Sequence, residues 1–314
     1  MKHRLKITII ILVMFLITQF IGLYVANYYS NERVNIDGSI EKIDSPDLPF
    51  GMETPEPQGS TDFIGTFISI LLAFVMAISI IFLLTKYKSV FIMKLWFFIV
   101  VIIALGIAFN SFIPNNLKFS FYIVLGFSIL LAFFKTYKKN FLIHNFTELF
   151  IYPGIAAVFI PIINIYTIII LLILISIYDI WAVWHSGIMQ KMAKYQINEV
   201  GVFGGFFVPY ASKQVKAKIK KLKKKLTKKQ LKKKGIKVNV AILGGGDVVF
   251  PIITSGVVLK TIGLIPAIFV IFGGLLGLSY LLIFSKKKEF YPAMPFITIG
   301  LFLGIILGYL WVLI

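Results

Sequence analysis

Long apolar runs separated by short polar connections dominate the pattern of this chain. Nine runs are close to the length of about 20 residues that a helix needs to cross a bilayer. They cover approximately residues 6–27, 62–85, 91–113, 118–134, 144–161, 165–185, 238–258, 262–284 and 291–313. The first run is long and no clear A-x-A cleavage site follows it, so we predict a retained helix rather than a secretory signal. The pattern predicts an all-α, polytopic membrane protein with nine transmembrane helices.

Composition supports this fold class and removes several kinds of chemistry. The 314 residues are 59% hydrophobic, which is too apolar for a soluble domain of this size. The chain has no cysteine, so disulfides and thiolate metal sites are excluded. Its three histidines fall in three separate segments, and neither an HExxH nor a GxSG motif is present. We therefore expect no metal and no cofactor, and neither a zinc protease nor a rhomboid-type serine protease.

Basic residues are divided unequally between the two sides of the predicted bundle. Of 32 Lys and Arg, 28 fall on the connections of one side and 4 on those of the other. Positive residues concentrate in cytoplasmic loops, so the N-terminus is predicted to be cytoplasmic and the C-terminus extracytoplasmic. The chain then divides into a bundle of six spans (1–185), a basic cytoplasmic loop (186–237) and a bundle of three spans (238–314).

The basic loop has a distinctive core. The stretch Lys213–Lys237 holds 14 lysines, and Val215, Ile219, Leu222 and Leu226 recur on one face of a helix. A basic amphipathic helix lying on anionic lipid headgroups fits this pattern, with a solvated, disordered loop as the alternative. No aromatic or base-reading context accompanies the lysines, so we expect no nucleic-acid partner.

Two aspartates, Asp179 and Asp247, lie inside the sixth and seventh predicted spans. A carboxylate there costs roughly 2.5–3.5 kcal/mol on insertion scales, so it usually marks a functional site. At about 1.5 Å per residue, they lie roughly 9 and 14 Å from the cytoplasmic edge, close to one level. Two adjacent carboxyls share one proton, so that one activates water and the other donates to a carbonyl. The pair predicts an aspartic protease.

Three consecutive glycines, Gly244 to Gly246, precede Asp247. Each disfavours helix by up to about 1 kcal/mol relative to alanine. They are expected to loosen the backbone and to allow another chain to approach the acid closely. Small-residue packing between helices is the alternative.

Three motifs in order carry a resemblance to a known family. The segment 175–183, ISIYDIWAV, resembles the YD segment of presenilins, and Gly244–Asp247 fits their GxGD motif. Pro292-Ala293-Met294-Pro295 resembles the PAL motif, with Met294 in place of leucine. The order and the long loop between spans six and seven agree as well. The chain thus resembles presenilins and their archaeal homologues, which are GxGD-type intramembrane aspartyl proteases.

The resemblance implies Asp179 and Asp247 as the catalytic pair and a set of substrate-binding residues, namely Tyr178, Gly244, Gly245, Gly246, Pro292, Ala293 and Met294. Pro292 and Pro295 lack backbone donors, so the turn that they form is expected to leave backbone groups free to pair with an extended substrate. Tyr178 either orients substrate or lies at a helix interface.

Signal peptide peptidases share these motifs but insert in the opposite orientation. The charge distribution favours the presenilin orientation, which predicts single-span substrates with an external N-terminus. The protein is expected to be an integral, multi-pass protein, of the cytoplasmic membrane if the source is prokaryotic. A homo-oligomer is compatible with the sequence.

Other functions and roles stay open at this stage. Paired intramembrane aspartates also suit a cation or proton-coupled transporter, and a prepilin-type peptidase or a membrane scaffold are further alternatives. The apolar segment 202–208 is too short to span and is expected to pack, with a plug over the site as the alternative. Glu148, with His144 one turn earlier, is expected to be structural.

Overall fold

The structure is a computed structural model of the whole chain. It describes residues 5–30, 32–34, 40–42, 46–52, 60–87, 89–114, 119–138, 140–186, 195–196, 201–210, 239–285 and 291–313. The basic stretch Lys213–Lys237 lies outside these ranges.

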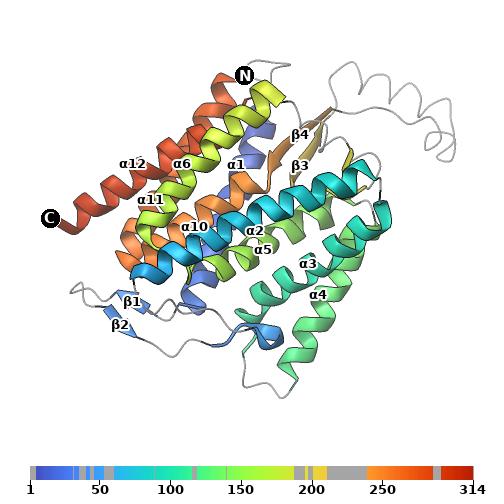
Figure 1. Cartoon of the computed structure of the whole chain (residues 1–314), viewed down its shortest axis with the longest axis horizontal. Helices are drawn as coiled ribbons and strands as arrows, with labels where there is room; N and C mark the ends of the chain where they lie inside the picture. Colours follow the sequence, from blue (N-terminus) through green and yellow to red (C-terminus); the bar gives the residue numbers. More distant parts are fainter. Residues whose placement is uncertain are drawn as a thin grey trace.

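Long α-helices occupy the ranges of the predicted apolar spans (Figure 1). They are α1 (Leu5–Tyr28), α2 (Ser60–Lys86), α3 (Val90–Asn110), α4 (Ser120–Tyr137), α5 (Phe141–Phe159), α6 (Ile165–Trp181), α10 (Gly246–Thr261), α11 (Leu264–Phe284) and α12 (Met294–Leu313). Within the described part of the chain, seven segments are long and apolar enough to cross a membrane, and α2 and α10 are not among them. The molecule is therefore a mostly helical, polytopic membrane protein.

Short elements supplement the helices. A turn of 3-10 helix spans Pro49–Gly51, and a π-helical turn at Ala182–Ser186 extends α6. Strands β1 (Glu32–Val34) and β2 (Ile40–Lys42) form one antiparallel pair. Strands β3 (Gly205–Tyr210) and β4 (Asn239–Gly244) form another, with Gly205 opposite Gly244.

The prediction of a continuous helix over 238–258 is wrong at its start. Residues Asn239–Gly244 form β4, and α10 begins only at Gly246 and continues to Thr261. Three glycines weaken a helix at this point, and pairing with β3 gives the backbone of residues 239–244 an alternative set of hydrogen bonds. Asp247 therefore lies on the first turn of its helix rather than deep within it, so the depth of roughly 14 Å, which assumed a continuous helix from residue 238, does not apply.

The helices share one core. Helix α5 packs against α1, α3 and α10, while α10 also contacts α11 and α6, and α6 contacts α12 (Figure 1). Fully buried apolar side chains from several helices meet there, including Phe15, Leu105, Ile252 and Ile297. This arrangement brings the end of α6, the start of α10 and the start of α12 together.

Glycines lock α11 against α12. A Cβ on Gly300 would overlap the carbonyl oxygen of Gly273, and a Cβ on Gly273 would overlap that of Gly300. On Gly304 it would lie 2.6 Å from the carbonyl oxygen of Phe269. Small residues of this kind let membrane helices approach to backbone contact, so α11 and α12 form a tight antiparallel pair.

Candidate active site

Asp179 lies on the last turn of α6 and faces the start of α12. Its carboxylate accepts a hydrogen bond at Oδ2 from the Met294 amide, at 3.0 Å, and the Ala293 backbone also hydrogen-bonds it. Only 7% of the residue is exposed. Because unpaired amides and the positive end of the dipole meet at a helix N-terminus, this is a favourable position for a carboxylate.

Side chains fix α6 at both ends. At its start, the Asn164 side chain accepts from the Thr167 amide at 2.8 Å, and the Thr167 hydroxyl accepts from the Asn164 amide at 2.9 Å. This capping box defines where the helix begins. Near its end, the hydroxyls of Ser176 and Thr298 lie 2.9 Å apart and tie α6 to α12. Asp179 follows Ser176 by less than one turn, so both contacts orient it.

Asp247 lies on the first turn of α10, with Gly245 at the N-cap. The Gly244 backbone hydrogen-bonds its carboxylate. Helix α10 contacts α6, so the two aspartates lie in the same part of the bundle although they come from different helices. The Gln19 side chain of α1 donates to the Val248 carbonyl oxygen at 3.1 Å and supports this turn.

The glycines before Asp247 permit two close approaches. A Cβ on Gly245 would lie 2.8 Å from Cε1 of Tyr152, which belongs to α5. A Cβ on Gly244 would lie 3.1 Å from Oδ2 of Asp247. The neighbours of these glycines are thus a tyrosine ring and the acid's own carboxyl. Gly246 is exposed, and its Cβ would meet only Phe250, at 3.8 Å.

The β3–β4 pair leads directly into Asp247. One face of the pair is buried, with Phe206 and Ala241 fully covered and Leu243 4% exposed. The Phe206 ring meets the Tyr152 ring edge-on at 5.7 Å. The apolar segment 202–208 therefore packs against the bundle beside the candidate site.

The other predicted substrate-binding residues are placed differently. Pro292 and Met294 are buried and Ala293 is half-buried. Of the backbone groups in this turn, the Met294 amide is bonded to the Asp179 carboxylate. Tyr178 is 47% exposed, and its ring lies beside that of Trp181, with centroids 6.3 Å apart.

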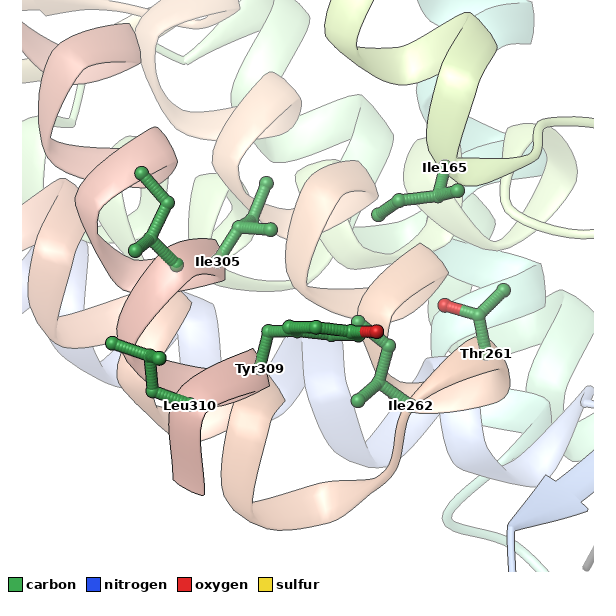
Figure 2. Close-up of a pocket in the computed structure, with 7 residues that line it drawn as sticks. Ile165, Thr261, Ile262, Ile305, Tyr309 and Leu310 are labelled. Atoms are coloured by element: carbon green, nitrogen blue, oxygen red, sulfur yellow. The ribbon is translucent and has the colours of Figure 1, made fainter. Parts of the chain in front are cut away.

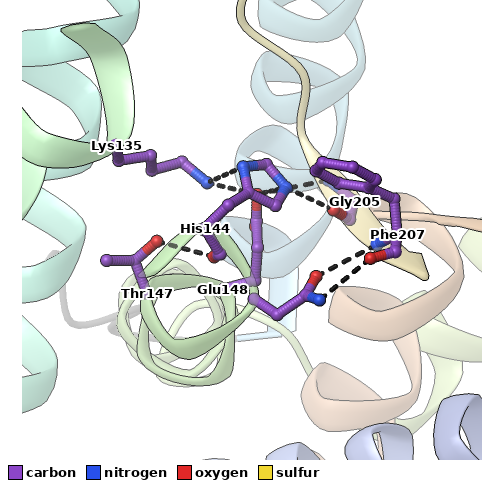
Figure 3. A network of polar contacts seen from close by, with 7 residues as sticks. Lys135, His144, Thr147, Glu148, Gly205 and Phe207 are labelled. Carbon is purple, nitrogen blue, oxygen red and sulfur yellow. Dashed lines mark hydrogen bonds and ion pairs between the residues drawn. The ribbon is translucent and has the colours of Figure 1, made fainter. Parts of the chain in front are cut away.

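Glu148 has a cationic partner that sequence reasoning missed. Its carboxylate pairs with Lys135 of α4 and lies 3.3 Å from Nε2 of His144, and the side chains of the Lys135–Glu148 pair are each 1% exposed (Figure 3). The spacing of four residues between His144 and Glu148 indicated that both lie on one face of a helix. Nothing local indicated that Lys135 would turn inward from the end of another helix.

A pocket of about 410 Å³ lies away from the aspartates. Its lining is almost wholly apolar (Figure 2), and comes from the start of α6 and the ends of α10 and α12: Ile165, Thr261, Ile262, Ile305, Ile306, Tyr309 and Leu310. Asp179, Asp247 and Met294 sit at the opposite ends of these helices. At 1.5 Å per residue, roughly 20 Å separates Ile165 from Asp179 along α6, so this pocket is not the aspartate site.

Comparisons with known proteins identify the family and the fold. The family model described as signal-peptide peptidase, presenilin aspartyl protease matches residues 47–314. Two solved structures of a presenilin family intramembrane aspartate protease share the fold. The one in space group C222 has a TM-score of 0.59 at 16% identity, over 97% of this chain and 99% of that one. The one in space group P2 has a TM-score of 0.56 at 17% identity, over 96% of each. No curated protein sequence matches the chain.

The family model matches most of the length of the chain. The chain therefore belongs to the signal-peptide peptidase and presenilin family of aspartyl proteases, and is an integral, multi-pass membrane protein.

Proposed function

We propose that the protein is an intramembrane endopeptidase of the GxGD type, in which Asp179 and Asp247 form the catalytic pair. One observation carries the proposal. Asp179, on the last turn of α6, accepts a hydrogen bond from the start of α12, and Asp247 lies on the first turn of α10, in a bundle where α6 contacts both α10 and α12. Family membership supports this function over a cation or proton-coupled transporter.

The chemistry requires one proton to be held by the pair. The charged carboxylate removes a proton from water, and the resulting hydroxide attacks the carbonyl carbon of the scissile peptide. The neutral carboxyl gives its proton to the carbonyl oxygen, so that a gem-diol forms. The peptide C–N bond then breaks as the acid that took the proton from water gives it to the nitrogen. At the same time a hydroxyl of the gem-diol gives its proton to the other acid as the C=O of the carboxylic acid product forms, so the pair again holds one proton. Neither a metal nor a cofactor takes part in these steps.

Substrate must be extended when it reaches the pair, because the amides of a helix are bonded internally. The edge of β4 that faces away from β3 offers the matching backbone groups. In an antiparallel pair, every second residue points its amide and carbonyl outward, and on β4 these include Val240 and Ile242. Both side chains are partly exposed. A substrate strand added here would run toward Asp247, as in other cases of strand addition.

Topology completes the proposal. We propose nine spans from the apolar runs and a cytoplasmic N-terminus from the charge distribution, with the chain divided at residues 185 and 237. Single-span proteins with an external N-terminus are the expected substrates. The lysines of Lys213–Lys237 would bind anionic headgroups on the cytoplasmic side. Gly244–Gly246 and Pro292–Met294 would shape the site, and Tyr178 would either orient the substrate or lie at a helix interface.

The decisive experiment presents a single-span peptide to the purified protein in detergent or bicelles. The variants Asp179→Asn and Asp247→Asn keep size and hydrogen bonding but remove the charge. We expect both to abolish cleavage, and a hydroxyl-containing transition-state mimic to block the wild type. Cleavage that survives in either variant would reject the catalytic pair. Ion flux across vesicles without any cleavage would favour the transporter.

A further inference from the structure

Side chains of α5 occupy the outer edge of β3 where a third strand would otherwise pair. The Asn145 side chain accepts from the Phe207 amide at 3.0 Å and donates to the Phe207 carbonyl oxygen at 2.9 Å. Nε2 of His144 donates to the Gly205 carbonyl oxygen at 2.8 Å, and the Gly205 amide donates to Glu148 at 3.3 Å (Figure 3). One face of a helix thus supplies the hydrogen bonds of a neighbouring strand.

The outward amides of β3 are all accounted for over the described strand. Because the backbone of Phe207 is bonded to Asn145, the outward-facing residues of β3 are Gly205, Phe207 and Pro209. The first two have their amides and carbonyls bonded by α5. The third has no amide hydrogen, which is typical of a residue at a sheet edge. No outward amide of β3 is therefore left to pair with another chain.

The contacts of α5 are themselves held in place. Glu148 is paired with the buried Lys135 of α4, and the His144 ring packs edge-on against the Phe207 ring at 4.9 Å. Gly205 has φ of +153°, a conformation that favours glycine, and a Cβ there would lie 2.6 Å from the Leu243 carbonyl oxygen. The start of β3 is thus fixed against both α5 and β4.

The two edges of the sheet consequently differ. The outer edge of β4 has no neighbouring strand among the described segments, and Val240 and Ile242 on it are 38% and 44% exposed. Strand β4 pairs with β3, and β3 is bonded to α5, so β3 links β4 to the bundle. Since Asp247 follows the end of β4 by three residues, a shift of β3 along α5 would also shift β4 and the chain that leads into Asp247.

We propose that Asn145, assisted by His144 and Glu148, is a positioning residue that closes β3, directs an extended substrate to β4 alone and fixes which substrate bond reaches the aspartates. This inference rests on the proposed protease function and on substrate binding as a strand. Asn145 does not touch the reacting atoms. It acts through the register of the β3–β4 pair.

The test compares Asn145→Ala with Asn140→Ala. Asn140 lies at the same helix end and caps α5 by accepting from the Leu142 amide at 3.0 Å, so its loss should destabilise the helix and leave the two hydrogen bonds between Asn145 and Phe207 in place. Cleavage products of one single-span peptide are identified by mass spectrometry, and kcat and KM are measured for each variant.

We expect Asn145→Ala to cut at additional bonds, displaced by two residues, because a slip by two keeps the buried face of a strand buried. Loss of two neutral hydrogen bonds should lower kcat/KM by about tenfold. Asn145→Gln, which keeps the amide, should restore part of the fidelity, and Asn140→Ala should cut only at the native bond. A folded Asn145→Ala protein that cuts the native bond alone, with unchanged constants, would overturn the proposal.

Amide hydrogen exchange separates this inference from the proposed function. In the wild type, a bound single-span peptide should slow exchange in residues 240–242 of β4 and leave β3 unchanged. In Asn145→Ala, the peptide should also slow exchange in β3. This pattern can be measured on a protein that cuts nothing, in which case the protease proposal alone fails. Equal slowing of both strands in the wild type would overturn the positioning role.

Discussion

The Lys135–Glu148 pair offers a quantitative test of how this bundle tolerates buried charge. Each side chain is 1% exposed, so solvent screens the pair very little. The substitution Lys135→Met fills a similar volume but leaves Glu148 as a buried carboxylate without its cation. Breaking a buried pair in this way costs about 3–5 kcal/mol. The Lys135 ammonium also lies 5.5 Å from the centroid of the Phe97 ring, and that contact is lost as well.

The protein should lose stability when one charge of the pair is removed, and much less when both are removed. Glu148→Gln should be similarly destabilising, since it leaves a buried ammonium. The double variant carries neither charge, and a glutamine oxygen can still accept from the Gly205 amide. Replacing a buried pair by neutral groups of similar volume is often neutral or stabilising. We therefore expect the double variant to be close to the wild type, and far better than the sum of the single variants.

The assay is unfolding of the purified protein in one detergent, by denaturant and by heat, for the wild type and three variants. At about 2–4 °C per kcal/mol, each single substitution should lower the midpoint by roughly 6–20 °C. The double-variant cycle then gives the coupling energy directly. Losses that add in the double variant would refute the reasoning, because they would mean that the two charges do not stabilise each other. If Lys135→Met lowers the free energy of unfolding by less than about 1 kcal/mol, the pair contributes no more than an exposed ion pair does, which would also contradict the reasoning.

Four further predictions follow from the contacts above. Gly300→Ala should destabilise the protein by about 1–3 kcal/mol in the same unfolding assay, because the new Cβ would overlap a backbone carbonyl of α11. Gly126→Ala on α4 is the control: its Cβ would have nothing within 4 Å, so the substitution should be neutral or slightly stabilising. Asn164→Ala should cost about 1 kcal/mol by removing the capping box of α6, and an unchanged midpoint would mean that the cap contributes nothing. Burial raises the pKa of the Tyr29 phenol well above its usual value, so the contribution of the phenol to the free energy of unfolding is fully present below about pH 10 and is lost only at higher pH. The destabilisation by Tyr29→Phe should therefore be constant from about pH 5 to 9. A change of that destabilisation with pH in this range would contradict the assignment. Cleavage should follow a bell-shaped pH profile because the aspartates share one proton, and a flat profile across about pH 4–9 with chemistry limiting would oppose that arrangement.

Much of the fold follows from the apolar pattern. Each predicted span contains a long helix whose bounds differ from the prediction by a few residues, because burial in lipid favours continuous apolar helices whatever their neighbours. The exception is the segment 239–244. Its residues are apolar and suit a strand or a helix equally, and pairing with β3, some thirty residues earlier in the sequence, decides between the two.

The candidate site was only partly predictable. The pairing of Asp179 with Asp247 could be proposed because both acids stand out against an apolar background. The use of the Met294 amide by Asp179 could not, since it depends on how α12 meets α6. The role of Asn145 gave no signal either. A single amide side chain on a helix has many uses, and only the position of β3 identifies this one.

The interlocked glycines of α11 and α12 have a mechanical consequence for Asp179. Helices in backbone contact along several turns behave as one stiff lever, because neither can rotate without steric overlap. Met294 sits at the tip of this lever and holds the Asp179 carboxylate. A displacement at the far end of α11 would therefore reach the carboxylate through α12, as a tilt of the two helices together.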